Sequence, residues 1–257
     1  MDETYHIRLN YDKIQQAGCA LITGDPDRVP EIASQISQNF LELERSREFR
    51  SVLAFHEADP ILILSHGIGG PSTAIVMEEM AMIGIRTVIR IGTTGAIQDN
   101  IAVGDVIISS ASVRLDGTTI QYVPIEYPAV ATPEIVMLLK AAAIDLCIPY
   151  HVGITASTDS FYPGQERYDS FLGYVQKKLQ GSREEWKKFN VLNYEMESST
   201  VLTLGNLFKM KTGCITGVVD NRIQGESILE ANKKKAVDNA IKVGVLALKN
   251  HLIQPGI

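Results

Sequence analysis

The stretch from Cys19 to Arg28 reads CALITGDPDR and changes pattern halfway along. Residues Cys19–Thr23 are an apolar run that is too short for a helix and ends at a glycine, which is typical of a buried strand. Gly24 and Pro26 are turn residues, and the apolar residues beyond them recur at helical spacing. These residues are Val29, Ile32, Ala33 and Ile36. The stretch therefore predicts a strand, a tight turn and a helix that begins near Arg28.

The same alternation of short apolar runs and helical periodicity continues along the chain. Further strands are expected at 47–56, 60–65, 86–92, 106–113, 150–157 and 211–219. Further helices are expected at 133–146, 193–208 and 226–251, and another is expected to follow Ser72 and end near Gly84. Because the strands are almost continuously apolar, they should form a sheet that is covered on both faces. We therefore predict an α/β fold in a single domain, residues 1–257: a three-layer sandwich with a central mixed, largely parallel β-sheet flanked by helices.

The composition is that of an ordinary globular protein. Of the 257 residues, 45% are hydrophobic and 21% are charged, which indicates neither a disordered chain nor a membrane protein. The first residues are too polar for a signal peptide, and no apolar run approaches the roughly 18 residues that cross a bilayer. We expect a cytoplasmic protein with no membrane partner. A net charge of −6 argues against a nucleic-acid partner.

Two further features of the composition bear on the fold. The three cysteines, Cys19, Cys147 and Cys214, are widely spaced, and we expect reduced thiols rather than disulfides or a metal site. The segment 171–190 is rich in Lys, Glu and Gly, and we expect it to be a mobile insertion.

Two arginines occupy positions that suit an anion. Gly24 lets the backbone approach a ligand, and Arg28 lies at the start of a helix whose free N–H groups favour negative charge. Alone, Arg28 is equally consistent with a surface residue. Arg90 stands inside an apolar strand, where a permanently charged guanidinium needs a partner. The partner is either an anionic ligand or, in a structural ion pair, a glutamate such as Glu78 or Glu79.

Small polar residues follow Arg90 directly. Thr93 and Thr94 stand where its strand should end, and ligands bind at the carboxyl ends of strands in parallel sheets. Their hydroxyl groups favour the ligand over the structural ion pair.

The segment 161–168 reads FYPGQERY. Pro163 and Gly164 predict a turn, after which the chain should be extended, so that Gln165 and Arg167 point to the same side. An amide beside a guanidinium complements a flat ring edge that carries a carbonyl, an N–H and a second carbonyl, as uracil does. The alternative is a solvated loop in which neither side chain binds anything.

Acidic residues mark two further positions. Asn193 is a plausible N-cap, so Glu195 and Glu197 would open a helix where its dipole favours them. Helix stabilisation alone explains them, but a carboxylate there could also bind the diol of a ribose while Met196 packs on the sugar. Asp220 and its neighbours end the last expected strand, where they are equally typical of a turn.

Several motifs occur in a fixed order: GDPDR, SREF, HGIGGPS, RIGTTGAIQ, VGDV, ASVRLDG, FYPGQERY and NYEMES. In this order they resemble the uridine phosphorylases of nucleoside phosphorylase family I. The resemblance runs from about His6 to Arg222 and so covers nearly the whole chain.

The resemblance implies three groups of site residues. Phosphate would be bound by Gly24, Arg28, Arg90 and Thr93, with Arg47 from an adjoining subunit. Ribose would be bound by Met196, Glu197, Glu195 and Thr94, with His6 from the neighbour. Uracil would be held by Gln165 and Arg167 against Phe161, with Arg222 assisting.

The resemblance also implies a reaction and an assembly. The reaction is the reversible phosphorolysis of uridine, and we expect also of deoxyuridine, to uracil and the sugar 1-phosphate. Inorganic phosphate is the co-substrate, no cofactor is required, and Gln165, Arg167 and Arg90 are the catalytic residues. The assembly is a hexamer of three dimers with shared active sites. Some members hold a potassium ion between subunits, and the matching positions are Glu48, the Ile68 carbonyl and Ser72.

Asp220 departs from the resemblance. The uridine enzymes have an apolar residue there, whereas the purine members place an aspartate nearby to protonate the purine. A purine or broad-specificity nucleoside phosphorylase is therefore an alternative, but Gln165 and Arg167 have no role in a purine site, and we expect Asp220 to point away from it. A hydrolytic nucleosidase and a nucleoside-binding protein that is not an enzyme are further alternatives. A dehydrogenase is disfavoured because residues 67–70 lack the GxGxxG spacing.

Overall fold

The computed structural model describes residues 2–223 and 230–253. Its strands are β1 (Cys19–Thr23), β2 (Leu41–Ser46), β3 (Phe49–His56), β4 (Asp59–Ser65), β5 (Thr87–Ala96), β6 (Val106–Leu115), β7 (Ala129–Val130), β8 (Tyr150–Thr158), β9 (Val191–Glu195) and β10 (Lys211–Asn221). Its α-helices are α1 (Arg28–Ile36), α2 (Gly70–Met82), α3 (Pro133–Asp145), α4 (Ser182–Lys188), α5 (Ser198–Leu207) and α6 (Glu230–Ile253).

The strands form one mixed sheet with β5 at its centre. β5 pairs in parallel with β1 and with β10, and β1 continues in parallel to β4. The strands β4, β3 and β2 then follow as an antiparallel extension. On the other side, β10 pairs with β6, β6 with β8 and β8 with β9, and β9 returns to the carboxyl end of β5. The strands β5, β10, β6, β8 and β9 thus form a closed ring.

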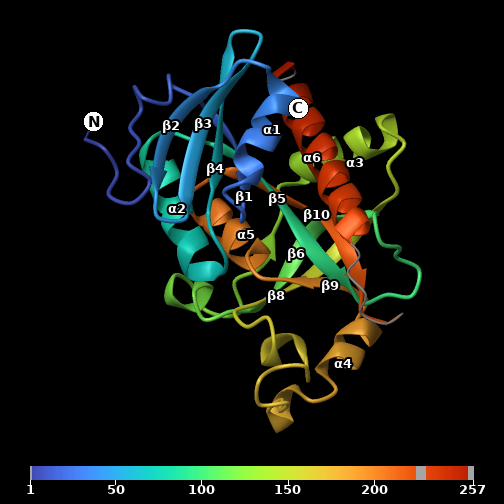
Figure 1. Ribbon diagram of the computed structural model, residues 1–257. Coiled ribbons are helices and arrows are strands. Elements are labelled where there is room, and N and C mark those ends of the chain that lie inside the picture. Colours follow the sequence, from blue (N-terminus) through green and yellow to red (C-terminus); the bar gives the residue numbers. More distant parts are fainter. Residues whose placement is uncertain (1, 224–229, 254–257) are drawn as a thin grey trace.

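Helices cover the sheet on both sides (Figure 1). One apolar core lies between the sheet and the helices α2 and α5, and includes Met77, Met80 and Leu202. The other lies beneath α1, α3 and α6, and includes Ile32, Leu139 and Leu248. The sandwich of helices around a mixed sheet is the predicted fold class. No helix in the described part of the chain has both the length and the apolar composition needed to cross a membrane.

Most of the predicted elements are confirmed, and two were placed wrongly. Asn193 is in strand β9 and not at the start of a helix, because its side chain is held on both sides in the sheet: it accepts from Thr155 Oγ1 and donates to Thr94 Oγ1. The helix begins at Ser198 instead. Strand β5 continues to Ala96, through the residues that were expected to form a turn.

Two segments were predicted only in part or not at all. Strand β2 was not predicted, because its residues LELERS lie at the edge of the sheet, where none of them is buried and they form no apolar run. The segment 171–190 contains helix α4 and the fully buried Val175, so part of it packs against the rest of the chain. The three cysteines are free thiols, as predicted; Cys19 and Cys214 are buried and Cys147 is exposed.

Candidate functional site

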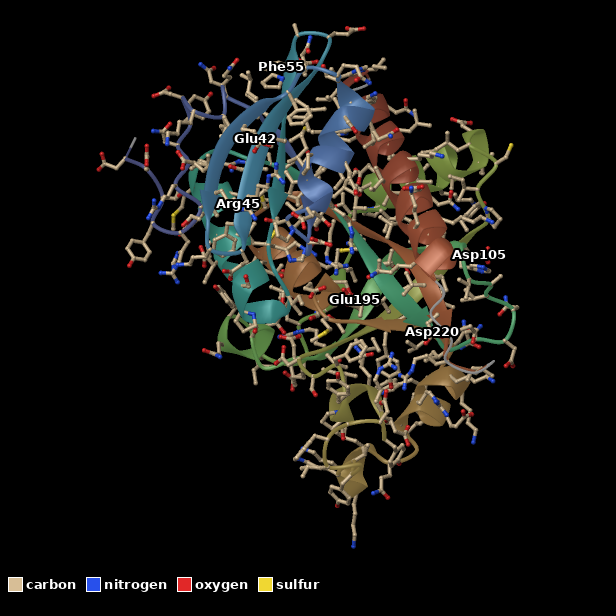
Figure 2. The ribbon with its side chains drawn as sticks, in the orientation of Figure 1. Glu42, Arg45, Phe55, Asp105, Glu195 and Asp220 are labelled. Carbon is tan, nitrogen blue, oxygen red and sulfur yellow. The ribbon has the colours of Figure 1, made fainter. Side chains whose placement is uncertain are left out.

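A cavity of about 630 Å³ opens at the carboxyl ends of the central strands. It is lined by most of the residues that the sequence singled out: Gly24, Arg28, Glu48, Ile68, Arg90, Thr93, Thr94, Phe161, Gln165, Arg167, Glu195, Met196, Glu197 and Asp220. We call the part around Gly24, Arg28 and Arg90 the anion end, and the part around Gln165 and Arg167 the base end. In Figure 2 the labelled Glu195 and Asp220 lie near the end of the sheet that faces the projecting segment around α4.

The anion end is built by glycines that leave room for arginine. A Cβ added to Gly92 would lie 2.6 Å from Nη1 of Arg90, so only glycine allows the Arg90 side chain to fold back over its own strand. Arg28 lies at the start of α1 with its Nη1 donating to Thr23 Oγ1 at 3.4 Å. Burial lowers the pKa of Arg28 from its ordinary value, although the group stays a cation at neutral pH.

Arg90 is paired with two carboxylates. Its Nη1 lies 3.1 Å from Glu195 Oε2, and its Nη2 donates to Glu197 Oε2. The expected partners Glu78 and Glu79 were wrong, because Glu79 instead accepts from the backbone and ring of His6. Burial lowers the pKa of Arg90, but the two carboxylates outweigh this effect and raise it. Arg90 is therefore a permanent cation inside the cavity.

The two glutamates have different surroundings. Glu195 ends β9 and caps α5 from outside the helix: it accepts from the backbone N–H of Glu197 at 2.9 Å and of Ser198 at 2.8 Å. Glu195 therefore stabilises helix α5, as expected, although it lies in the preceding strand and not in the helix. Glu197 accepts from the Gly69 N–H at 2.7 Å and lines the cavity. Burial raises the pKa of Glu197, and Arg90 opposes that shift.

The base end presents an amide and a guanidinium. Gln165 is 3% exposed and Arg167 is 7% exposed, so the alternative of a solvated loop is wrong for both side chains. The carbon of the Arg167 guanidinium stands 4.2 Å above the ring of Phe161, a cation–π contact that fixes its plane. The segment is not extended as predicted: Pro163–Gln165 is a 3₁₀ turn, and Glu166 is left-handed with φ 52°.

The two charged residues at the end of β10 have different places: Arg222 contacts the base-end loop, and Asp220 lines the cavity. Arg222 does not line the cavity; its Nη1 donates to the carbonyl oxygen of Gln165 at 2.7 Å, so it holds the backbone of the base end. Asp220 is 3% exposed and lines the cavity. The expectation that Asp220 points away was wrong, because the register of β10 shifts between Val218 and Asp220 and turns its side chain inward.

Glu166 connects the base end to α4, a role that no local signal in the sequence indicates. Its carboxylate accepts from the backbone N–H of Gly181 and from that of Arg183 at 2.7 Å. These donors lie at the start of α4, more than a dozen residues along the chain, so only the folded structure reveals the contact.

We expect Glu166→Ala to loosen α4 while leaving the sheet intact. Losing a carboxylate that caps a helix costs about 1 kcal/mol, so amide hydrogen exchange at Gly181 and Arg183 should accelerate about fivefold. Exchange in β5 should not change. The exposed Glu185 provides the control, as Glu185→Ala removes an acid from the first turn of α4 but leaves both hydrogen bonds of Glu166 in place. Equal exchange in Glu166→Ala and the wild type would show that the contact does not hold α4.

Four of the expected site residues do not line this cavity: Arg222, described above, and His6, Arg47 and Ser72. His6 lies on another cavity, of about 500 Å³, beside α2. Arg47 is exposed in the turn between β2 and β3, with φ 57°. Both were expected to serve a neighbouring subunit, which stays a prediction. Ser72 lies just outside the cavity and donates to Glu48 Oε1 at 3.0 Å.

The positions matched to potassium supply suitable atoms. Glu48 and Ser72 place a carboxylate and a hydroxyl oxygen within hydrogen-bond distance, and hard monovalent cations prefer oxygen ligands. Ile68 lies in the loop between β4 and α2 and is 77% exposed. In the described part of the chain, no group of three or more His, Cys, Asp or Glu side chains could hold a metal ion.

Comparison with known proteins agrees with this arrangement. Residues 19–249 match the family model of the phosphorylase superfamily. The chain is 45% identical to the uridine phosphorylase of Escherichia coli over 97% of its length and 98% of that protein. It is 46% identical to the uridine phosphorylase of Haemophilus influenzae, over 96% and 98% of the two chains. For the uridine phosphorylase of Thermococcus kodakarensis the identity is 43%, over 95% and 86%. This chain belongs to the phosphorylase superfamily.

Proposed function

We propose that the protein is a uridine phosphorylase, a pentosyltransferase that converts uridine and phosphate to uracil and ribose 1-phosphate. The observation that carries the proposal is a single cavity with arginines at its anion end and Gln165 with Arg167 at its base end. The uridine phosphorylases named above align with this chain over nearly its whole length. Deoxyuridine, which differs only in the sugar, is expected to react as well.

The anion end would position the phosphate nucleophile. Arg28 and Arg90, together with the Thr93 hydroxyl and the backbone at Gly24, would hold the phosphate facing C1′ of the sugar. Arg47 of an adjoining subunit would complete this set. Holding both reactants in line removes much of the entropic cost of a reaction between two molecules. Phosphate is itself the nucleophile, so the protein needs no nucleophilic side chain.

The sugar would lie between the two ends. Glu197 and Met196 line the cavity there, and a carboxylate can accept hydrogen bonds from both hydroxyls of a ribose diol. Cleavage of a bond at C1′ develops positive charge on the sugar, as in glycoside hydrolysis. Glu197 would therefore orient the diol close to the developing charge. The Thr94 hydroxyl already donates to the Tyr194 carbonyl at 2.6 Å, so it would act chiefly by fixing β9.

The base end would stabilise the leaving group. Uracil departs as an anion whose charge spreads onto its carbonyl oxygens, and the N–H groups of Gln165 and Arg167 would donate to that edge. Arg222 would act through the Gln165 backbone that it holds.

The assembly, location and ion requirement complete the proposal. His6 and Arg47 lie outside their own chain's cavity, which supports a dimer with shared sites, and three such dimers would form a hexamer in the cytoplasm. No cofactor is required. A potassium ion between subunits would be bound by Glu48, Ser72 and the Ile68 carbonyl.

Phosphate dependence tests the proposal. With uridine, we expect release of uracil only when phosphate is present, with ribose 1-phosphate as the second product. Release of uracil and free ribose without phosphate would identify a hydrolase. Binding of uridine without any base release would identify a non-catalytic binding protein. Either result would contradict the proposal.

The same assay with inosine and thymidine examines the role of Asp220. A carboxyl group at the base end could serve a purine, so inosine is the relevant competitor. We expect uridine to be preferred, because Gln165 and Arg167 complement the pyrimidine edge.

A further inference from the structure

His66 stands at the same level of the sheet as the two glycines of the anion end. Thr23 is in register with Ser65 of β4 and with the residue before Gly92 on β5. The next residues, Gly24, His66 and Gly92, therefore lie at one level of the sheet, with Gly24 between the other two. The backbone confirms the alignment, since the His66 N–H donates to the Thr23 carbonyl at 2.8 Å.

The tautomer of His66 follows from its contact with α2. Thr73 Oγ1 lies 3.1 Å from His66 Nδ1 and 2.9 Å from the carbonyl oxygen of Gly69. A hydroxyl has one proton, and we assign it to the shorter of the two contacts, the one with the Gly69 carbonyl. His66 Nδ1 must then be the donor to Thr73. His66 Nε2 consequently carries a lone pair and acts as an acceptor.

This acceptor is buried near cations. His66 is fully buried, and its Nε2 has no hydrogen-bond partner among residues 2–223 and 230–253. The ring touches the anion end directly, since a Cβ on Gly24 would lie 3.7 Å from His66 Cε1. Burial, together with the positive charges of Arg90 and Arg28, lowers the pKa of His66 well below its ordinary value. This shift favours the neutral imidazole.

Arg90 has donors that complement this acceptor. A guanidinium carries five N–H groups. Among the residues that the structure describes, neither Nε nor Nη1 of Arg90 has a hydrogen-bond partner of good geometry. The Arg90 guanidinium folds over Gly92, which lies at the same level of the sheet as His66 with Gly24 between them, and the charge of Arg90 acts on the His66 ring. A buried donor or acceptor without a partner costs free energy, so a contact between these groups is favourable.

We propose that His66 is a positioning residue for the phosphate site, in which its neutral Nε2 accepts from Arg90 and turns that guanidinium toward the bound anion. The inference rests on the proposed function and deepens it. His66 touches neither phosphate nor nucleoside in this arrangement. Its effect should consequently appear in phosphate binding, and not in the binding of uridine.

Two substitutions distinguish the roles of the two ring nitrogens of His66. His66→Gln keeps a polar group near the position of Nε2, whereas His66→Asn keeps one near Nδ1 and removes the acceptor. We expect the KM for phosphate to rise about tenfold in His66→Asn, which is the effect of one hydrogen bond to a charged group. His66→Gln should retain most of the phosphate affinity. The kcat at saturating phosphate and the KM for uridine should change less than about twofold in either variant.

His56→Asn is the matched control, because His56 ends β3 and lines none of the cavity. It should leave the KM for phosphate unchanged. Phosphate binding measured by calorimetry without nucleoside gives a second readout that needs no turnover. Weaker phosphate binding in His66→Asn would support the inference even if the protein proved not to cleave uridine.

Two results would overturn the inference. The first is an unchanged phosphate affinity in His66→Asn, whatever its melting temperature, since a purely structural residue would change stability alone. The second is an equal loss in His66→Asn and His66→Gln, because the acceptor at Nε2 would then not matter.

Discussion

Arg167→Ala should lose roughly 10²–10³ in kcat while the protein remains folded, because removing one donor to a developing oxyanion typically costs that much. Arg167 lines the base end, and its guanidinium is held above the Phe161 ring at 4.2 Å. In the transition state the departing uracil carries negative charge that the intact nucleoside lacks. The donor therefore stabilises the transition state more than the bound substrate, and the loss should appear in kcat as well as in kcat/KM.

The measurement is the steady-state rate of uracil release at saturating phosphate, with the melting temperature as the check on folding. Arg45→Ala is the control, since Arg45 is exposed on β2 and does not line the cavity (Figure 2). Arg167→Lys adds information, as a lysine keeps the charge but loses the planar pair of donors. Near-normal turnover in Arg167→Ala would refute the role of the base end.

At the base end, the sequence predicted which residues line the cavity but not the backbone conformation that positions them. Gln165 and Arg167 were singled out because an extended chain would place both on one side. They do line one cavity, but Gln165 ends a 3₁₀ turn, and Glu166 between them is left-handed. The Glu166 carboxylate and Arg222 hold this shape, and both act across more than a dozen residues of sequence. Local propensity carries no information about such contacts.

The segment from Asn193 to Glu197 shows the same limit of prediction from local sequence. The spacing around Asn193 satisfied the rules for a helix start, and the true start lies five residues later. The side chain of Asn193 is bound within the sheet by Thr155 and Thr94, so tertiary contacts override the local signal. Glu195 still stabilises the helix, as the rule anticipates, but from the end of the preceding strand.

The strands, in contrast, were predictable because burial on both faces makes them continuously apolar. The run Cys19–Thr23 is buried at every position. The edge strand Leu41–Ser46 lacks that signal because one of its edges has no neighbour and none of its residues is buried. His66 was overlooked for a related reason. A histidine after an apolar strand is common, and only the alignment of three strands shows that His66 lies beside the anion end.

Arg90→Ala should raise the KM for phosphate on the order of 10- to 100-fold, the effect of losing one or two charge-assisted hydrogen bonds. The same substitution removes the cation that Glu195 and Glu197 share, and breaking a buried ion pair costs about 3–5 kcal/mol of stability. Both effects are therefore expected in this one variant. A kinetic measurement on Arg90→Ala alone would not separate phosphate binding from damage to the fold.

A double substitution separates the two effects. In Arg90→Met with Glu195→Gln, the charge at Arg90 is removed together with one of the buried charges that it compensates. Glu195 also accepts from the N–H of Ser198, and a glutamine side chain can accept there too. We expect the double variant to recover part of the lost melting temperature, because fewer buried charges lack a partner, while the KM for phosphate stays high. If stability and phosphate KM recovered together, or if phosphate kinetics never changed, Arg90 would be a structural ion-pair residue and the anion would have to be held by other groups.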